Sequence, residues 1–172
     1  MRALITLWWQ ERAAGGGSVV PARAQLDPCA IPRGILPYMF IYERVAGRLR
    51  CRLAGTRLRD IFGRDETGCH LDEVIAPQHL AGRTALFDRC LDAGLPLFYR
   101  GYLVPAGRHW RAFNRLLLPA AAKAGQPATQ VMGLLRVYDP SQARTVATLP
   151  ADADGLVDFR LLGEDDCRSL LL

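Results

Sequence analysis

This chain of 172 residues lacks the short motifs that accompany most catalytic and metal sites. It contains no GxGxxG or phosphate-loop pattern, no HExxH and no nucleophile elbow, the motifs that position phosphates, zinc or a catalytic serine. Its five cysteines include no CxxC pair, and its three histidines form no zinc-spaced cluster. The sequence therefore predicts neither a catalytic residue nor a metal site, and an enzyme without a known motif is only a third alternative.

Long apolar runs are also missing. The N-terminal run, Ala3 to Trp9, is stopped at once by Gln10, Glu11 and Arg12, far short of the roughly 20 residues that a membrane-spanning helix needs. We expect no signal peptide and no membrane span. Cysteines without a disulfide pattern suit a reducing compartment, so the expected location is the cytoplasm.

Lysine is nearly absent, because Lys123 is the single lysine among 22 basic residues, and the net charge is +5. A basic balance can serve an anionic partner, but an arginine-rich composition also follows from a GC-rich genome. Several arginines alternate with apolar residues in expected strands, and they would form a basic plate on the outer sheet face or pair with acids. The residues of this expected plate are Arg48, Arg50, Arg52, Arg111, Arg115 and Arg136. Nucleic-acid binding through the plate is the alternative function, but nucleic acid is not the favoured partner.

The most informative stretch runs from residue 48 to 68. Apolar residues alternate with arginines over 48–54, which is the period of a half-buried strand. Gly55 ends this strand, Thr56 is expected to cap a short helix with its hydroxyl, and Gly63 to close that helix in a left-handed conformation. Because Gly55 joins strand to helix with no spare residue, we expect a conformation or close packing that a side chain would obstruct.

The other patterns predict an amphipathic helix at 2–13, strands at 38–45, 97–104, 110–118 and 130–138, a helical turn at 71–75 and a long helix at 77–93 closed by Gly94. Two strands, several helices and three strands predict an α+β fold with a five-stranded antiparallel sheet and helices on one face. We divide the chain into an N-terminal helix and proline-rich lead-in (1–37), a main domain (38–140) and a C-terminal appendage (141–172). In the appendage, 156–162 could pair as a strand or form a helix.

A series of different short motifs follows a fixed order over residues 8 to 138. In chain order they are Trp9 and Arg12; Pro21, Arg23 and Asp27-Pro28; Ile31-Pro32 and Leu36-Pro37; Arg52, Gly55 and Thr56; Phe62-Gly63-Arg64-Asp65 with Thr67-Gly68; and Leu117-Leu118-Pro119. This series resembles a bacterial family of small stand-alone PAS-like proteins within the PAS superfamily. The resemblance implies a PAS-like sheet with a structural corner at Arg52, Gly55, Thr56 and Gly68. It also implies a non-enzymatic sensory or protein-interaction module in bacterial signalling.

In a PAS-like fold a ligand would lie between the sheet and the helices. We expect Phe62, Leu80, Thr84 and Phe87 to line this space, although simple core packing gives the same pattern. No cofactor is indicated. Haem needs an axial ligand, for which His79 is the best candidate, yet a lone histidine near a helix start is more often solvated. The flavin photochemistry of light-sensing PAS proteins needs an N-C-R-F-L-Q stretch, which Gly68-Cys69-His70-Leu71 does not match.

The N-terminal helix carries an apolar stripe of Leu4, Ile5 and Trp8, which Trp9 extends. Two tryptophans are rarely left in water. We therefore expect the helix to pack on an outer sheet face, its own or a partner's, and two chains to associate through it as a homodimer. No kinase, cyclase or helix-turn-helix pattern accompanies the domain, so signalling would need a separate signalling protein as a partner.

Overall fold

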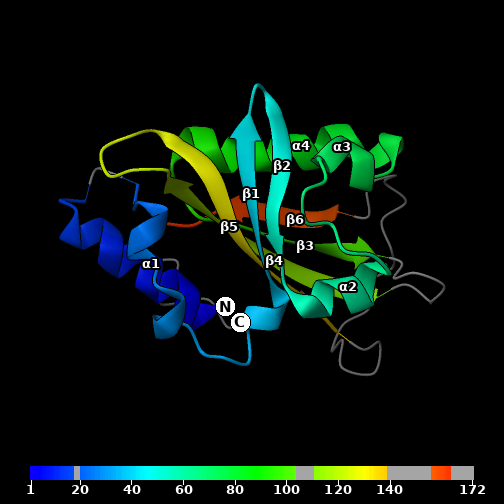
Figure 1. The fold of residues 1–172 in the computed structure, drawn as a ribbon, viewed down its shortest axis with the longest axis horizontal. Coiled ribbons are helices and arrows are strands. Elements are labelled where there is room, and N and C mark those ends of the chain that lie inside the picture. The colour runs from blue at the N-terminus through cyan, green and yellow to red at the C-terminus, as the bar shows by residue number, and fades with distance from the viewer. Residues whose placement is uncertain (18–19, 104–110, 139–155, 164–172) are drawn as a thin grey trace.

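The computed structural model describes residues 1–17, 20–103, 111–138 and 156–163, which form one six-stranded antiparallel sheet with the strand order β2-β1-β5-β4-β3-β6 (Figure 1). The strands are β1 (Met39–Val45), β2 (Arg48–Ala54), β3 (Leu97–Leu103), β4 (Arg111–Ala121), β5 (Ala128–Val137) and β6 (Leu156–Leu161). The helices are α1 (Arg2–Ala14), α2 (Thr56–Phe62), α3 (Leu71–Val74) and α4 (Pro77–Ala93), with short 3-10 turns at Arg23–Gln25, Pro28–Ala30 and Leu36–Tyr38. The expected α+β, PAS-like fold is confirmed.

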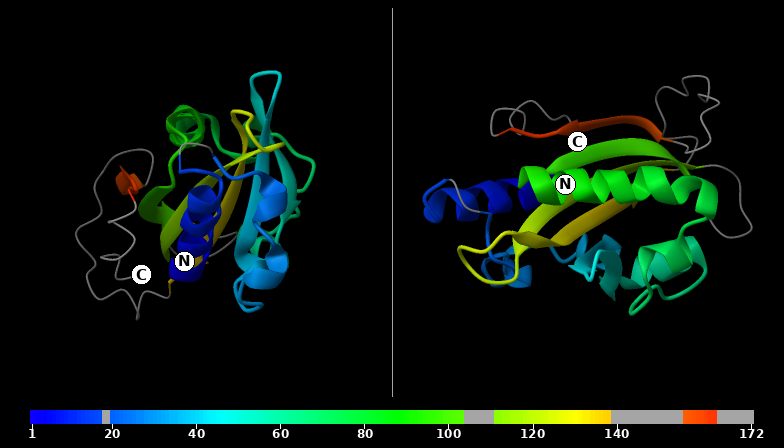
Figure 2. Two further views of the ribbon diagram at one scale, coloured as in Figure 1. Left: turned by 90° about the vertical axis from the view of Figure 1, so that its left-hand side faces the viewer. Right: turned by 90° about the horizontal axis from the view of Figure 1, so that it is seen from above.

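The sheet has one strand more than the five expected. β6, from the segment interpreted as an appendage, pairs antiparallel with β3 from Leu97↔Leu161 to Gly101↔Leu156 and lies at the sheet edge (Figure 2, right panel). A bare edge strand exposes unpaired N–H and C=O groups, and β6 covers those of β3. From the sequence we also expect a turn at Gly107 and interpret 164–172 as a segment that could form a last helical turn, and both lie outside the described residues.

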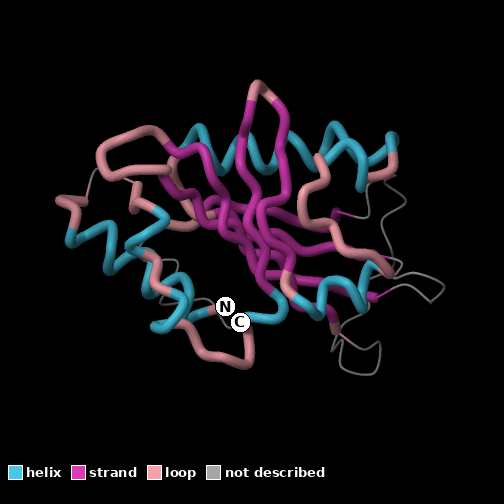
Figure 3. The backbone as a smooth tube through the Cα atoms, in the orientation of Figure 1, coloured by secondary structure: helices cyan, strands magenta, loops and turns pink. Residues whose placement is uncertain are grey.

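Helices lie on both sides of the sheet, with α4 along the top of Figure 1 and α1 at its lower left; Figure 3 shows the strands gathered between them. The two faces of β4 and β5 are both apolar, because alternate residues point to opposite sides. Residues on the α4 face include Phe113, Leu117, Val131 and Leu135. Residues on the α1 face include Leu116, Leu118, Met132 and Leu134. Both faces of the central strands are therefore buried.

α1 packs on the sheet of its own chain. Leu4 and Ile5 are 1% exposed and Trp8 is fully buried, and the Trp8 indole donates a hydrogen bond to the Pro119 carbonyl oxygen at 2.7 Å. The expected packing on an outer sheet face is thus seen within one chain. The homodimer stays a prediction, and its main argument weakens because the tryptophan stripe is already covered.

The corner between β2 and α2 is tight. Gly55, not Thr56, is the N-cap residue of α2, so the expected Thr56 cap is wrong; Gly55 holds the extended backbone that an N-cap needs. Its φ of −63° suits any residue, but a Cβ there would overlap the Pro37 carbonyl oxygen and lie 2.9 Å from that of Leu36. Close packing is therefore what requires glycine at this position. Gly63 closes α2 at φ +75°, as expected.

Candidate ligand-binding pocket

A cavity of about 280 Å³ lies between the sheet and helices α2, α3 and α4. Its apolar walls include Phe40, Phe62, Val74, Phe87 and Phe113, and its polar lining consists of Tyr42, Glu66, His79, Arg83, Tyr102 and Arg115. Ligand pockets usually measure about 300–1,000 Å³ and combine apolar walls with a few polar groups. The cavity therefore has the composition of a binding site for a small molecule.

Two of the four residues expected to line this space do so. Phe62 and Phe87 are in the pocket wall, whereas Leu80 packs against the neighbouring core and Thr84 is half-buried outside the lining. The pocket side of α4 is formed at the spacing of His79, Arg83 and Phe87, residues four apart on one helix face. Leu80 and Thr84 each lie one residue beyond a position that faces the pocket, because the expectation followed the less polar residues of the helix.

Phe40 covers a glycine of the neighbouring strand. It lies opposite Gly133 in the β1–β5 register, and a Cβ on Gly133 would overlap the phenyl ring. The ring also contacts Tyr42 and Phe87 at centroid distances of 5.8 and 6.3 Å. Because position 133 is glycine, the Phe40 ring packs directly on the sheet at that position, and the cavity stays open beside the ring.

The turn at residues 63–68 supplies the acidic group of the pocket. The Asp65 carboxylate accepts a hydrogen bond from the Thr67 amide at 2.9 Å, which lowers the pKa of Asp65. The Thr67 hydroxyl accepts one from the Ala54 amide at 3.2 Å, and Gly68 supplies a φ of +89°. The turn is thereby fastened to β2, and Glu66 between its anchors lines the cavity. The motif at residues 62–68, which contributes to the family resemblance, thus also places the Glu66 carboxylate in the pocket.

Glu66 meets a tyrosine inside the pocket. The Tyr42 hydroxyl donates to the Glu66 carboxylate at 3.4 Å. Burial raises the pKa of Glu66, and the positive charges of Arg115 and Arg64 oppose that rise. Burial also raises the pKa of Tyr42. Tyr42 is therefore a neutral donor at physiological pH, and Glu66 takes up a proton more readily than an exposed glutamate.

Two arginines reach the same pair of aromatic rings. The guanidinium carbon of Arg115 on β4 lies 5.6 and 5.5 Å from the ring centroids of Tyr99 and Phe113, and that of Arg83 on α4 lies 5.4 Å from each. Arg115 is also 5.3 Å from the Phe40 centroid, and it donates a hydrogen bond to the Tyr99 hydroxyl at 2.9 Å. Guanidinium groups stack on aromatic faces and are weakly hydrated, so these rings hold two cations at an apolar site.

The expected basic plate is not continuous. Arg115 lies opposite Leu135, which is on the α4 face, whereas Arg136 lies opposite Asn114. Since directly paired residues share a face and neighbours alternate, Arg115 points into the pocket and Arg136 to the other side. The grouping of both on one outer face is therefore wrong.

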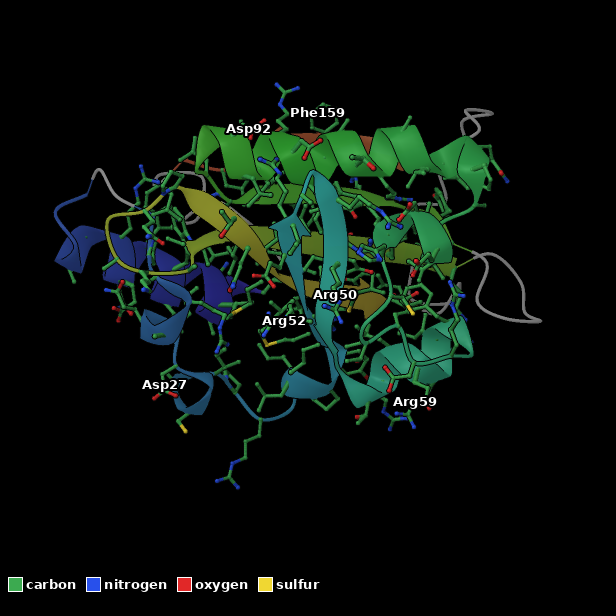
Figure 4. The ribbon with its side chains drawn as sticks, turned by 45° about the horizontal axis from the view of Figure 1, so that its top comes forward. Asp27, Arg50, Arg52, Arg59, Asp92 and Phe159 are labelled. Atoms are coloured by element: carbon green, nitrogen blue, oxygen red, sulfur yellow. The ribbon has the colours of Figure 1, made fainter. Side chains whose placement is uncertain are left out.

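The arginines of β2 lie along the outside of the hairpin, where Figure 4 labels two of them. Arg48 forms an ion pair with Asp72 at 2.8 Å and Arg52 with Glu43 at 2.7 Å, and Arg50 donates to the Gly68 carbonyl at 3.3 Å. The surface therefore offers less free positive charge than the sequence suggests.

The two buried cysteines are poor nucleophiles, and the described residues form no metal centre. Burial raises the pKa of Cys51 to about 11 and also raises that of Cys90, so both thiols stay protonated at neutral pH and are poor nucleophiles. No described group of three His, Cys, Asp or Glu side chains could hold a metal ion. None of the described helices is long and apolar enough to cross a membrane.

Comparison with known proteins gives one finding. Residues 1–136 match a family model described as a PAS domain. No curated protein and no solved structure matches the chain.

Proposed function

Because this chain belongs to the PAS domain family, whose members are generally sensory or signalling modules, we propose that it is a non-enzymatic sensor that binds a small molecule between its sheet and its helices. The observation that supports this most strongly is the cavity of about 280 Å³, which has aromatic walls and convergent polar groups. A fold that served only as a scaffold would gain stability by filling that volume with side chains.

The proposed output is contact with a separate signalling protein. Helices α2, α3 and α4 all contribute to the pocket wall, so a ligand that favours one arrangement of these helices would shift the population of that arrangement. The site of action is the cytoplasm, in keeping with free thiols at Cys29, Cys51, Cys69 and Cys90.

Native mass spectrometry of freshly purified protein tests this proposal. We expect a bound small molecule in the wild type, and the same spectrum reports whether the chain is a monomer or a dimer. Val74→Trp, which places a large side chain in the cavity wall, should remove the bound molecule. Val45→Trp is the matched control, because Val45 is 46% exposed at the hairpin end and does not line the cavity.

Two results would contradict the proposal. One is a wild-type mass equal to the chain alone, with no gain in melting temperature when a small-molecule extract of the source cells is added back. The other is a bound molecule that Val74→Trp retains as fully as Val45→Trp does. Nucleic-acid binding is not proposed as a second function, since no feature of the described surface favours it.

A further inference from the structure

The pocket carries more positive than negative charge. Two guanidinium groups line it, from Arg83 and Arg115, and Glu66 is the acid among its described lining residues. Part of that carboxylate already accepts a hydrogen bond from Tyr42. With both arginines and the glutamate ionised, the described lining therefore carries an excess positive charge in apolar surroundings, where charges interact more strongly than in water.

Arg115 has a donor to spare. A guanidinium group carries five N–H donors, and one nitrogen of Arg115 donates to the Tyr99 hydroxyl. Its Nε is buried without a hydrogen-bond partner in the part of the chain that the structure describes. A buried polar group without a partner is costly, so an oxygen acceptor entering the cavity beside Arg115 would remove that cost.

The rings around Arg115 fix its orientation. Its side chain stacks against Phe40, Tyr99 and Phe113, and Arg83 lies against two of the same rings. The planar fork of an arginine matches a carboxylate, which it can bind through two parallel hydrogen bonds. The charge excess, the spare donor and the fixed fork are separate observations, and all three select an anion.

The other walls set the shape of the ligand. Phe62 and Phe87, together with Val74, offer apolar surface, and the volume of about 280 Å³ is at the small end of ligand pockets. An apolar body of one ring or a short chain fits these walls. Because Arg83 and Arg115 lie against the same two rings, their charges are close together. A second acidic group on the far side of the ligand's body would lie against Phe62, Phe87 and Val74, where an unpaired charge is strongly disfavoured.

We infer that the pocket selects a small organic monocarboxylate with an aromatic or aliphatic body, its carboxylate beside Arg115 and Arg83 and its body against Phe62, Phe87 and Val74. This inference rests on the proposed ligand-binding function and names its chemical class. Glu66 lowers the affinity of such a ligand by repulsion and limits the site to weak or moderate binding.

A matched panel tests the charge of the ligand. Benzoate, 4-phenylbutyrate and octanoate are titrated into the full chain by isothermal calorimetry, each beside the primary amide and the amine with the same body. We expect at least one carboxylate to bind, its amide to bind at least tenfold more weakly, and its amine not to bind. If amides or amines bind as tightly as the carboxylates, the carboxylate inference is wrong while the ligand-binding function stands. If no member binds while native mass spectrometry still shows a bound small molecule, the carboxylate inference is wrong and the ligand-binding function stands.

Two variants that should change the carboxylate affinity in opposite directions locate the carboxylate in the pocket. Arg115→Gln should weaken carboxylate binding at least tenfold, whereas Glu66→Gln should strengthen it several-fold by removing a like charge. Arg136→Gln is the control, because Arg136 is exposed on the other face of the neighbouring strand, and it should bind as the wild type does. Far-ultraviolet circular dichroism shows whether each variant is folded. If Arg115→Gln does not fold, Arg115→Lys takes its place, because lysine keeps the positive charge but lacks the planar group that binds a carboxylate through two hydrogen bonds. Equal carboxylate affinity in the wild type, the Arg115 variant and Glu66→Gln would overturn the assignment.

Discussion

The two faces of the central sheet differ in what lies beside their polar groups. On the α1 face, Trp8 is fully buried and its indole N–H is satisfied by the Pro119 carbonyl of the same chain. On the α4 face, Arg115 keeps a buried N–H without a partner in the described chain, next to an open cavity. Trp9 Nε1 on α1 and Gln130 Oε1 on β5 are likewise buried without a partner in the described chain. What distinguishes the α4 face is therefore the cavity beside its unpaired guanidinium N–H.

The same strands build both faces. Along β4, Phe113 and Arg115 line the cavity, whereas Leu116 and Leu118 are fully buried under α1. Under the proposed function, stability and ligand recognition depend on alternate residues of one strand, and a substitution should disturb mainly one of the two properties. The predictions below use this separation, and they are ordered from the largest expected effect to the smallest.

The largest effect is expected on the α1 face. Trp8→Ala should lower the free energy of unfolding by about 3–5 kcal/mol, the usual cost of truncating a buried aromatic residue. Phe62→Ala, in the half-buried wall of the cavity, should cost less than half as much, because it borders space that is already empty. Urea denaturation followed by circular dichroism measures both. Equal losses would show that the two faces are equally well packed, and the comparison would fail.

Where β2 passes into α2, a single added side chain should be almost as harmful. Gly55→Val should cost about 3 kcal/mol, at the upper end for overpacking, because its Cβ meets the main chain of Leu36 and Pro37. Gly34→Val is the matched control, since a Cβ on Gly34 meets nothing within 4 Å. Thermal melts of the two variants should differ by several degrees, and coincident melts would rule out the close contact.

A smaller, pH-dependent effect is expected from Glu66 on the α4 face. Burial raises its pKa, so the folded protein favours the protonated form, and the ionised carboxylate reduces stability as pH rises above 4.5, the ordinary pKa of glutamate. Glu66→Gln should therefore melt above the wild type at pH 7, and the difference should vanish as pH falls below 4.5.

Asp65, one residue away, provides a control of opposite sign. Its pKa is lowered by hydrogen bonds from Thr67, so its contribution to stability is present above its ordinary pKa of 3.8 and is lost as pH falls. Asp65→Asn should melt below the wild type at pH 7 and approach it in acid. If Glu66→Gln and Asp65→Asn change the melting temperature in the same direction and with the same pH dependence, the burial of Glu66 is contradicted.

No effect is expected from nucleic acid. Because Arg48 and Arg52 are paired with acids of their own chain, a fluorescent single-stranded oligonucleotide should show no binding at low salt. Binding that falls steeply with salt and disappears when Arg48, Arg50 and Arg52 are all changed to Glu would instead restore the basic plate as a functional surface.

The sequence predicts the elements of this fold better than the orientation of their side chains. The bounds 48–54 and 77–93 agree with β2 and α4, because alternation, an N-terminal proline and a C-terminal glycine are local signals. The sequence does not decide between strand and helix for the sixth strand, since residues 156–161 become a strand only through pairing with β3.

The pocket shows why the remainder could not be predicted. From Leu116 to Ala121 every residue of β4 is buried, so the pattern does not say which parity faces the helices. Only the register with β5, itself a tertiary contact, places Arg115 beside Leu135 on the inner side. The role of Glu66 was equally hidden, because the motif around it indicates a turn but not the direction of the side chain between its anchors.

The alternation along β4 has a consequence for how this sequence can vary. Because side chains in a strand repeat every second residue, inserting or deleting one residue within 113–118 would turn every later side chain to the opposite face. Where the change precedes Arg115, that arginine would point under α1 while Leu116 would enter the cavity, and neither face would keep its chemistry. Relatives of this protein should therefore differ in this strand by substitution and keep its length, with insertions confined to the loops on either side.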